Sequence, residues 1–344
     1  MSLYPTTVLE WENVSVNYTF PPYHSLDNNL YSIIVSSICM VLGFIGNLLV
    51  IIVKLYRRDL KSNVAVYYIT SLAISDLMIS GVYAPSILLQ NLNHNEWVLG
   101  EEMCKVFMFI RNLAICISVQ TLTAIAFDRY QVICKPFEFA STTKRTRTTI
   151  LLIWIVGFCI CLPNLFLVHL KALPGSYDKP YFCSRFDDPQ HIFSRTYTTL
   201  TVIILYILPS LCMMLCYLSI FNHLMKESHA TVGSVAIRNR LMKERKKVAK
   251  TMLFVSFFFV ICWGCYWSYT MWYRFRRPRS LQSVRLTAFW MAWLPTLSSA
   301  VNPVIYAFSG QLFHKKQKGF NTSKSRSFTL RSNTFNNTRP ETGI

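Results

Sequence analysis

Seven long apolar stretches, separated by polar connections, constrain the fold of this 344-residue chain more than any other feature. A transmembrane helix needs ~20 mostly apolar residues to cross the ~30 Å hydrocarbon core of a bilayer. Hydrophobic residues make up 52% of the chain, more than a soluble domain of this size carries, and they are clumped rather than periodic. The sequence therefore predicts an all-α fold, a bundle of seven transmembrane helices. The expected spans are 31–53, 64–89, 104–134, 149–170, 197–221, 248–272 and 286–308.

Basic residues in the connections indicate how the bundle is oriented in the membrane. Loops on the cytosolic side carry an excess of lysine and arginine. Such residues gather here at 54–61, 144–147 and 238–250, after the first span and before the fourth and sixth. We therefore expect a multi-pass plasma-membrane protein with an extracellular N-terminus and a cytoplasmic C-terminus. The net charge of +19 fits this topology and attraction to anionic membrane lipid, so nucleic acid is not needed as a partner.

The chain divides into four expected segments. The first is a polar extracellular tail without the apolar core of a cleavable signal peptide, and glycosylation sequons begin at Asn13 and Asn17. After the seven-span domain, apolar and basic residues fall on opposite sides of a short stretch, as in a helix on the membrane surface. The last segment is rich in serine and threonine, which predicts a disordered tail that phosphorylation could turn into a docking site for a cytosolic regulator. The expected boundaries are 1–30, 31–308, 309–320 and 321–344.

Two of the eleven cysteines stand apart from the others. Nine lie inside apolar spans, where cysteine acts as a small buried hydrophobe. Cys104 begins the third span and Cys183 lies in the loop between the fourth and fifth, both on the oxidising side of the membrane. We therefore predict that they form a disulfide, the alternative being two free thiols.

Six polar residues lie in the inner half or middle of the predicted spans, where an isolated polar group is expensive. One is a carboxylate, and the other five carry neutral oxygens. Together they could hold a desolvated small cation, for which we favour sodium, or let the carboxylate take up a proton during a conformational change. The alternative is a hydrogen-bonded network that keeps the helices in register. The six residues are Asn47, Asp76, Ser118, Ser298, Ser299 and Asn302.

Asp128, Arg129 and Tyr130 close the third predicted span, where it meets the cytosol. Arg129 can pair with Asp128 there and change partner when neighbouring helices move, so we favour a switching role for the pair. Tyr217 and Tyr306 supply hydroxyls that could face Arg129 in a second state. The alternative is that the arginine only extends its charged end to the membrane surface.

A set of motifs, in order along all seven spans, resembles class A, rhodopsin-like G-protein-coupled receptors. The motifs are Gly46-Asn47, Leu72 with Asp76, Cys104, Asp128-Arg129-Tyr130 with Pro136-Phe137, Trp154, Pro209 with Tyr217, Cys262-Trp263, and Asn302-Pro303 with Tyr306 and Phe313. The resemblance implies a receptor that activates a heterotrimeric G protein, with arrestin and receptor kinases acting on the tail. It also implies a sodium pocket at the six polar residues and a ligand-sensing role for Trp263. The implied switch residues are Asp128, Arg129, Tyr130, Phe137, Pro209, Val119, Phe259, Tyr217, Pro303 and Tyr306.

Two positions depart from the family pattern. The proline expected two residues after Trp263 is Cys265 here, so a kink in the sixth helix must come from Gly264 or be milder. The acid at the base of the sixth helix that often pairs with Arg129 is replaced by Arg245. We therefore expect weaker restraint of the resting state and raised basal signalling.

Residues at the outer ends of the spans exclude several ligand classes. Thr296 stands where a retinal protein needs its Schiff-base lysine, and Arg111 stands where amine receptors carry an acid. A guanidinium that faces the bundle favours an anionic partner, which is either a ligand or an acid of this chain at Glu102, Asp187 or Asp188. Four arginines before the seventh span would steer an anion inward. The expected ligand-binding residues are Gln90, Arg111, Arg185, Asp187, Asp188, Trp263, Trp267 and Arg274.

Stretches around the third span and the second outer loop resemble receptors of the neuropeptide FF, pyroglutamylated RFamide, orexin and neuropeptide Y group. These stretches are 124–131, 183–188 and 197–199. The resemblance implies an amidated neuropeptide as ligand. Some members place an acid at the top of the sixth helix, where this chain has Arg274. A peptide that carries an acidic residue therefore fits better than one ending in Arg-Phe-amide.

Two alternatives to a peptide receptor remain open. A small anionic ligand, such as a lipid acid, would also suit Arg111. A seven-span transporter would need several carboxylates along a path through the membrane, and only Asp76 lies deep. The seven histidines are scattered and no nucleophile has a paired base, so the sequence predicts no enzyme and no catalytic residues.

Overall fold

The computed structural model describes residues 26–57, 64–93, 97–135, 142–172, 181–184, 192–229, 236–275 and 281–309. These ranges form α-helices, two π-helical turns and one pair of strands. In chain order the elements are α1 (Leu26–Tyr56), α2 (Val64–Met78), η2 (Ile79–Tyr83), α3 (Ala84–Leu92), α4 (Gly100–Cys134), α5 (Thr143–Cys161), α6 (Asn164–Leu167), β1 (His169–Ala172), β2 (Tyr181–Ser184), α7 (Ile192–Val202), η3 (Ile203–Ile207), α8 (Leu208–His229), α9 (Ala236–Phe275) and α10 (Leu281–Ser309).

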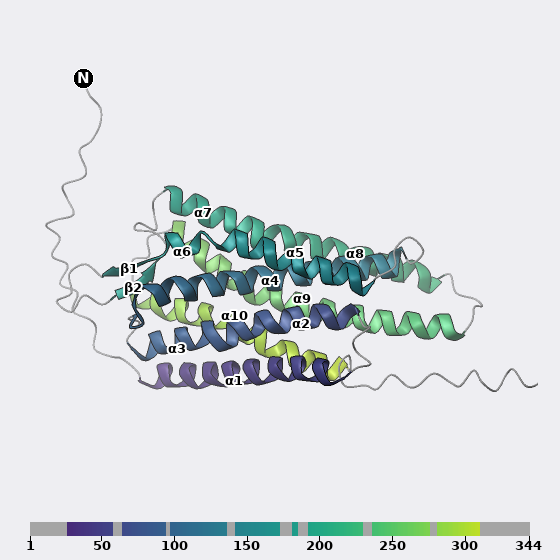
Figure 1. Cartoon of the computed structure of the whole chain (residues 1–344), viewed down its shortest axis with the longest axis horizontal. Coiled ribbons are helices and arrows are strands. Elements are labelled where there is room, and N and C mark those ends of the chain that lie inside the picture. The colour runs from purple at the N-terminus through teal and green to yellow at the C-terminus, as the bar shows by residue number, and fades with distance from the viewer. Residues whose placement is uncertain are drawn as a thin grey trace, which may run out of the picture. The chain divides into compact units, whose positions relative to one another are not determined.

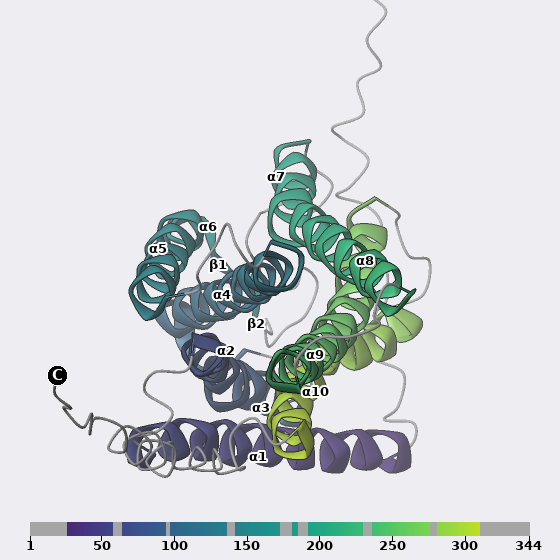
Figure 2. The same ribbon diagram turned by 90° about the vertical axis from the view of Figure 1, so that its right-hand side faces the viewer.

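Seven helical rods run side by side, which confirms the predicted architecture (Figures 1 and 2). The second rod is α2 continued through η2 into α3, and the fifth is α7 continued through η3 into α8. Within the described residues, six rods are long and apolar enough to cross a membrane. The seventh is α10, which packs along α1 and α9. In the view along the bundle, α4 lies between α2, α5 and α8, so it contacts more of its neighbours than the peripheral α1 does (Figure 2).

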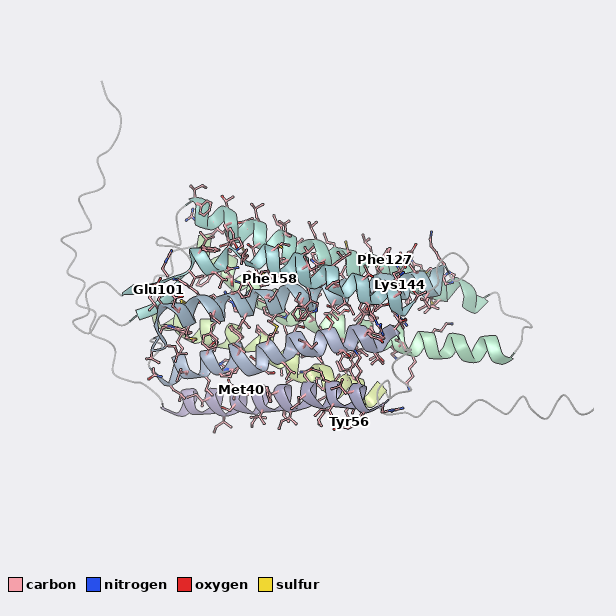
Figure 3. All side chains as sticks on the ribbon, viewed as in Figure 1. Met40, Tyr56, Glu101, Phe127, Lys144 and Phe158 are labelled. Atoms are coloured by element: carbon pink, nitrogen blue, oxygen red, sulfur yellow. A yellow bond between two sulfur atoms is a disulfide. The ribbon has the colours of Figure 1, made fainter. Side chains whose placement is uncertain are left out.

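The bundle carries apolar side chains on its outside and polar side chains in its interior. Leu151 on α5 is 60% exposed and Phe254 on α9 is 62% exposed, whereas Asn47, Asp76 and Ser118 are all buried. A soluble protein of this size does not cover its surface with such residues, because their exposure to water is unfavourable. The outward side chains along the rods in Figure 3 therefore face hydrocarbon, and the interior holds the polar groups.

The fourth span ends earlier than expected. We predicted 149–170, but α5 begins at Thr143, where the Thr142 hydroxyl accepts a hydrogen bond from the Arg145 backbone N–H at 3.3 Å, and it ends at Cys161. Pro163 then forms part of a turn, and the apolar residues that follow belong to α6 and β1. Apolar character alone does not separate a helix from a strand, so the boundary was wrong.

Strands β1 and β2 form an antiparallel hairpin that the sequence did not predict. Leu170 lies opposite Cys183 in the hairpin, and Cys183 forms the predicted disulfide with Cys104 at the start of α4. Beneath the hairpin, Cys104 packs with Trp97 and Val168 in a small apolar cluster. We call this end of the bundle the hairpin end. Glu101 marks it in Figure 3, whereas Tyr56, Phe127 and Lys144 mark the opposite end.

Other predictions fall partly or wholly outside the described residues. The sixth helix extends well beyond its predicted span 248–272, because α9 begins at Ala236. The glycosylation sequons at Asn13 and Asn17 and the tail 321–344 lie outside the described ranges. So does the expected surface helix 309–320, apart from Ser309, which ends α10.

Candidate functional site

Asp76 is the centre of a buried polar cluster that joins α1, α2 and α10. The side chain of Asn302 donates a hydrogen bond to the Asp76 carboxylate at 2.8 Å, and the Ser299 hydroxyl donates to the Asp76 backbone carbonyl at 3.0 Å. The Asn47 amide donates to the backbone carbonyls of Ser299 at 3.1 Å and Gly43 at 2.8 Å. Asp76 is only 2% exposed. Four of the six predicted pocket residues are therefore brought together through direct hydrogen bonds.

The other two predicted pocket residues are buried but form hydrogen bonds with other partners. Ser118 on α4 lies 2.9 Å from the Ser75 hydroxyl on α2, and Ser298 donates to the Pro295 carbonyl of its own helix at 2.8 Å. Ser75 was not among the predicted site residues, although it immediately precedes Asp76 in the sequence. Its burial, together with the Ser118 contact, makes it the link between α4 and the carboxylate cluster.

The donor set of this cluster suits a small hard cation. It offers one carboxylate, several neutral oxygens and the Asn47 carbonyl oxygen Oδ1, which is buried and has no hydrogen-bond donor among the described residues. Oxygen ligands of this kind are what hard cations prefer, and a single carboxylate matches a single positive charge. The residues present therefore fit the sodium ion that the sequence suggested.

At the end opposite the hairpin, Asp128 and Arg129 form a buried ion pair on α4. The two tyrosines proposed as later partners of Arg129 lie on other helices. The Tyr217 hydroxyl lies 3.3 Å from the hydroxyl of Ser256, a residue that we did not predict, and Tyr306 is fully buried. The implied switch residue Phe137 lies outside the described residues.

The remaining predicted switch residues lie inside the helical core. Val119 and Phe259 belong to one apolar cluster with Trp263, whose ring centroid lies 5.8 Å from that of Phe259. Pro209 is buried in α8, and Pro303 lies inside α10. The rings of Tyr130 and Phe127 lie 6.4 Å apart.

Trp263 lies one residue before Gly264 in a helix that the structure describes as continuous from Ala236 to Phe275. A Cβ atom at Gly264 would lie only 2.6 Å from the hydroxyl oxygen of Tyr206 on η3. Tyr206 was not predicted as a functional residue. Its contact is with a distant part of the chain, so no local pattern in the sequence could have indicated it.

Arg111 on α4 has no carboxylate partner among the described residues. Its guanidinium lies over the ring of Tyr83, with the central carbon 5.9 Å from the ring centroid. Glu102, one of the acids considered as its partner, instead pairs with Lys105 at 3.0 Å. The other two, Asp187 and Asp188, lie outside the described ranges. The Nε atom of Arg111 is buried and has no hydrogen-bond acceptor among the described residues.

An aromatic cluster on α9 carries further buried donors. Tyr266 packs edge-on against both Trp263 and Trp267, with ring centroids 5.5 and 5.2 Å apart. The indole N–H groups of Trp263 and Trp267 are buried without acceptors among the described residues. Tyr83 contacts Arg111, and Tyr266 contacts Trp263 and Trp267, although neither tyrosine was predicted.

Arg111, Trp263 and Trp267 thus each carry a buried N–H group without an acceptor among the described residues. The hydroxyl of Thr296 is also buried and unpaired in the part of the chain that the structure describes. A buried donor without an acceptor costs roughly 1–3 kcal/mol, so each of these groups favours a partner that supplies an oxygen acceptor. Of the other predicted ligand-binding residues, Gln90 is half-buried on α3, and the side chains of Arg185 and Arg274 are not described.

The chain resembles known receptors over most of its length. Residues 46–306 match the family described as 7 transmembrane receptor (rhodopsin family). The neuropeptide FF receptor 2 of Mus musculus is 29% identical over 313 residues, which are 87% of this chain and 74% of the mouse protein. The same receptor of Rattus norvegicus shows the same identity and coverage. A QRFP-like peptide receptor of Branchiostoma floridae is 29% identical over 283 residues, 81% of this chain and 74% of the lancelet protein.

Proposed function

Because the chain belongs to the rhodopsin family of seven-transmembrane receptors, which signal through G proteins, we propose that it is a receptor for an extracellular neuropeptide. The peptide binds between the hairpin and the outer ends of the helices. A heterotrimeric G protein binds at the opposite end. Membership of this non-enzymatic receptor family excludes the transporter that the sequence left open.

Two features support an orientation with the hairpin end outside the cell. The disulfide between Cys104 and Cys183 lies at that end, and such bonds persist on the oxidising side of the plasma membrane. Basic residues such as Lys54, Lys144 and Arg147 lie at the other end, as the positive-inside rule requires. The N-terminus is then extracellular and the C-terminus cytoplasmic.

The guanidinium of Arg111, which has no carboxylate partner among the described residues, is the observation that best supports an anionic group on the ligand. Its Nε atom and the indole N–H groups of Trp263 and Trp267 are buried donors, and a carboxylate can accept from several donors at once. The likeness to two kinds of peptide receptor favours a peptide as the carrier of that carboxylate. A lipid acid is the second candidate, because it would present the same group.

The polar cluster and the ion pair support a two-state mechanism. In the resting receptor Arg129 is held by Asp128, and the Asp76 cluster links α1, α2 and α10. Asn47, Asp76, Ser118, Ser298, Ser299 and Asn302 would hold the sodium ion, which when bound would neutralise the carboxylate. Ligand contact at Trp263 would repack Phe259 and release Arg129 toward Tyr217 or Tyr306.

A neuropeptide screen on cells that express the receptor tests this proposal, with calcium and cyclic AMP as readouts. For any peptide that activates, Arg111→Ala should reduce potency by about 10- to 100-fold, the effect of losing a charged hydrogen bond. Replacing the acidic residue of the peptide by its amide should cause the same loss in the wild type and no further loss in Arg111→Ala.

Lys105→Ala is the matched control, since Lys105 lies on the same helix and its ammonium is already paired with Glu101 and Glu102. It should leave potency unchanged. A set of activating peptides whose potency does not respond to Arg111→Ala would refute the anionic contact. Activation by lipid acids alone would replace the peptide with the second candidate.

A further inference from the structure

A groove of about 330 Å³ lies between α9 and α10 at the end of the bundle away from the hairpin. Its volume is at the lower end of the roughly 300–1,000 Å³ that ligand pockets occupy. Lys247, Lys250 and Phe254 line it from α9, and Val304 and Phe308 line it from α10. None of these five residues belongs to the candidate ligand site or to the switch described above.

The apolar part of the groove opens onto the outside of the bundle. Phe254 is 62% exposed, Val304 is 49% exposed and Phe308 is 88% exposed. In a helix bundle that spans a membrane, side chains exposed in this way contact acyl chains. The groove is therefore reached from the hydrocarbon layer as well as from the membrane surface.

The two lysines supply the polar part of the groove. They are three residues apart on α9, so they lie on one face of the helix, and both are exposed. No carboxylate whose side chain the structure describes lies within ion-pair distance of either ammonium group. The positive charge of the groove is thus not cancelled by a described neighbour.

Other basic residues at this end of the bundle are engaged differently. The Lys54 ammonium and the Arg147 guanidinium both lie over the ring of Tyr67, at 4.4 and 5.0 Å from its centroid. Arg147 also donates a hydrogen bond to the Tyr67 hydroxyl at 2.6 Å. These cations stabilise contacts between helices, whereas Lys247 and Lys250 face the groove.

We propose that this groove binds an anionic phospholipid of the cytoplasmic leaflet. The acyl chain lies against Phe254, Val304 and Phe308, and the headgroup phosphate lies between Lys247 and Lys250. This placement uses the orientation proposed above, in which α9 enters the membrane from the cytosol. Because the groove takes its walls from two helices, the bound lipid is sensitive to the spacing between α9 and α10.

Native mass spectrometry of the purified full-length receptor tests the proposal, with phosphatidylserine and phosphatidylcholine as competing probes. The wild type should retain phosphatidylserine in preference to phosphatidylcholine. Each lysine contributes about fivefold to that preference and the pair about thirtyfold, so Lys247→Gln with Lys250→Gln should abolish most of it. The charge-preserving pair Lys247→Arg with Lys250→Arg should keep it.

Two further variants separate the groove from general attraction to the surface. Lys144→Gln removes an exposed lysine of α5 at the same end of the bundle and should leave the preference intact. Val304→Trp fills the groove while both lysines remain, and it should displace the lipid. The proposal is overturned if the double glutamine variant retains phosphatidylserine as Lys144→Gln does, or if Val304→Trp has no effect. Since no agonist or G protein is used, either failure leaves the proposed receptor function untouched.

Discussion

The phenol hydroxyl of Tyr206 donates a hydrogen bond to the backbone carbonyl of Val260 at 2.8 Å, joining η3 to α9. In an α-helix that carbonyl also faces the backbone N–H four residues later, at Gly264. The hydroxyl occupies the space that a side chain at Gly264 would need. A side chain that reaches into a helix ladder is a recognised cause of bending, and this contact lies beside Cys265, which stands in place of the family's proline.

A double-mutant cycle on Tyr206 and Gly264 tests this relationship. Gly264→Ala alone should destabilise the receptor, because the new methyl group collides with the Tyr206 hydroxyl. In a Tyr206→Phe background that oxygen is absent, and the same substitution should stabilise by roughly 0.5–1 kcal/mol, the usual helix preference for alanine. Thermal unfolding of the purified variants measures both effects. If Gly264→Ala changes the stability in the same direction in both backgrounds, the Tyr206 hydroxyl does not determine its effect and the prediction is wrong.

Sodium should oppose agonist binding through Asp76. A cation bound at that carboxylate favours the resting arrangement in which Asn302 contacts it, so raising sodium should weaken agonist affinity severalfold. Asp76→Asn should remove the dependence, because the amide carries no charge to attract the ion. Radioligand competition in sodium chloride and in N-methylglucamine chloride of equal ionic strength measures how agonist affinity depends on sodium. A decrease in agonist affinity of equal size in both salts would show that the salts only screen charges and that no sodium site is involved.

Asp128→Asn should raise signalling in the absence of ligand. The substitution removes the charge that holds Arg129, and that arginine has no other acidic partner within the described residues. Breaking a buried ion pair from one side typically costs about 3–5 kcal/mol in the state that contained it, which favours the other state. Ligand-free nucleotide exchange on a reconstituted G protein is the measurement.

Arg245→Glu should act in the opposite direction by restoring the acid that many family members carry at the base of the sixth helix. Basal nucleotide exchange should fall below that of the wild type. The comparison also tests whether the wild type has raised basal activity at all. A ligand-free signal equal to that of cells without the receptor would show that it does not.

Removing either cysteine of the Cys104–Cys183 disulfide should reduce stability by about 2–4 kcal/mol and lower surface expression. The double serine variant should recover part of the expression lost by the singles, because it leaves no unpaired thiol to misreact. Cys159→Ser is the control, since Cys159 is exposed and not disulfide-bonded. Flow cytometry of an N-terminal epitope measures the outcome. Normal expression of the single variants would contradict it.

The sequence was most informative where the membrane limits the alternatives. Seven apolar stretches must become helices in lipid, and buried polar residues such as Asp76 must find partners, so both could be predicted. The end of the fourth span could not, because the residues from Pro163 to Leu170 stay apolar while the chain turns and enters a strand. Ser256 and Tyr206 were missed since their partners lie on other helices, and one sequence does not show which helix faces meet.

The π turn η2 rotates the outer part of the second rod relative to its inner part. A π turn holds one residue more than an α turn, which rotates everything after Tyr83 by about 100° relative to an uninterrupted α-helix begun at Asp76. Counting by helical periodicity from Asp76 would therefore assign α3 residues such as Gln90 to the wrong side. Deleting one residue within Ile79–Tyr83 would keep the second rod helical. The deletion would rotate α3 about the helix axis, so that a different set of α3 side chains would face the ligand.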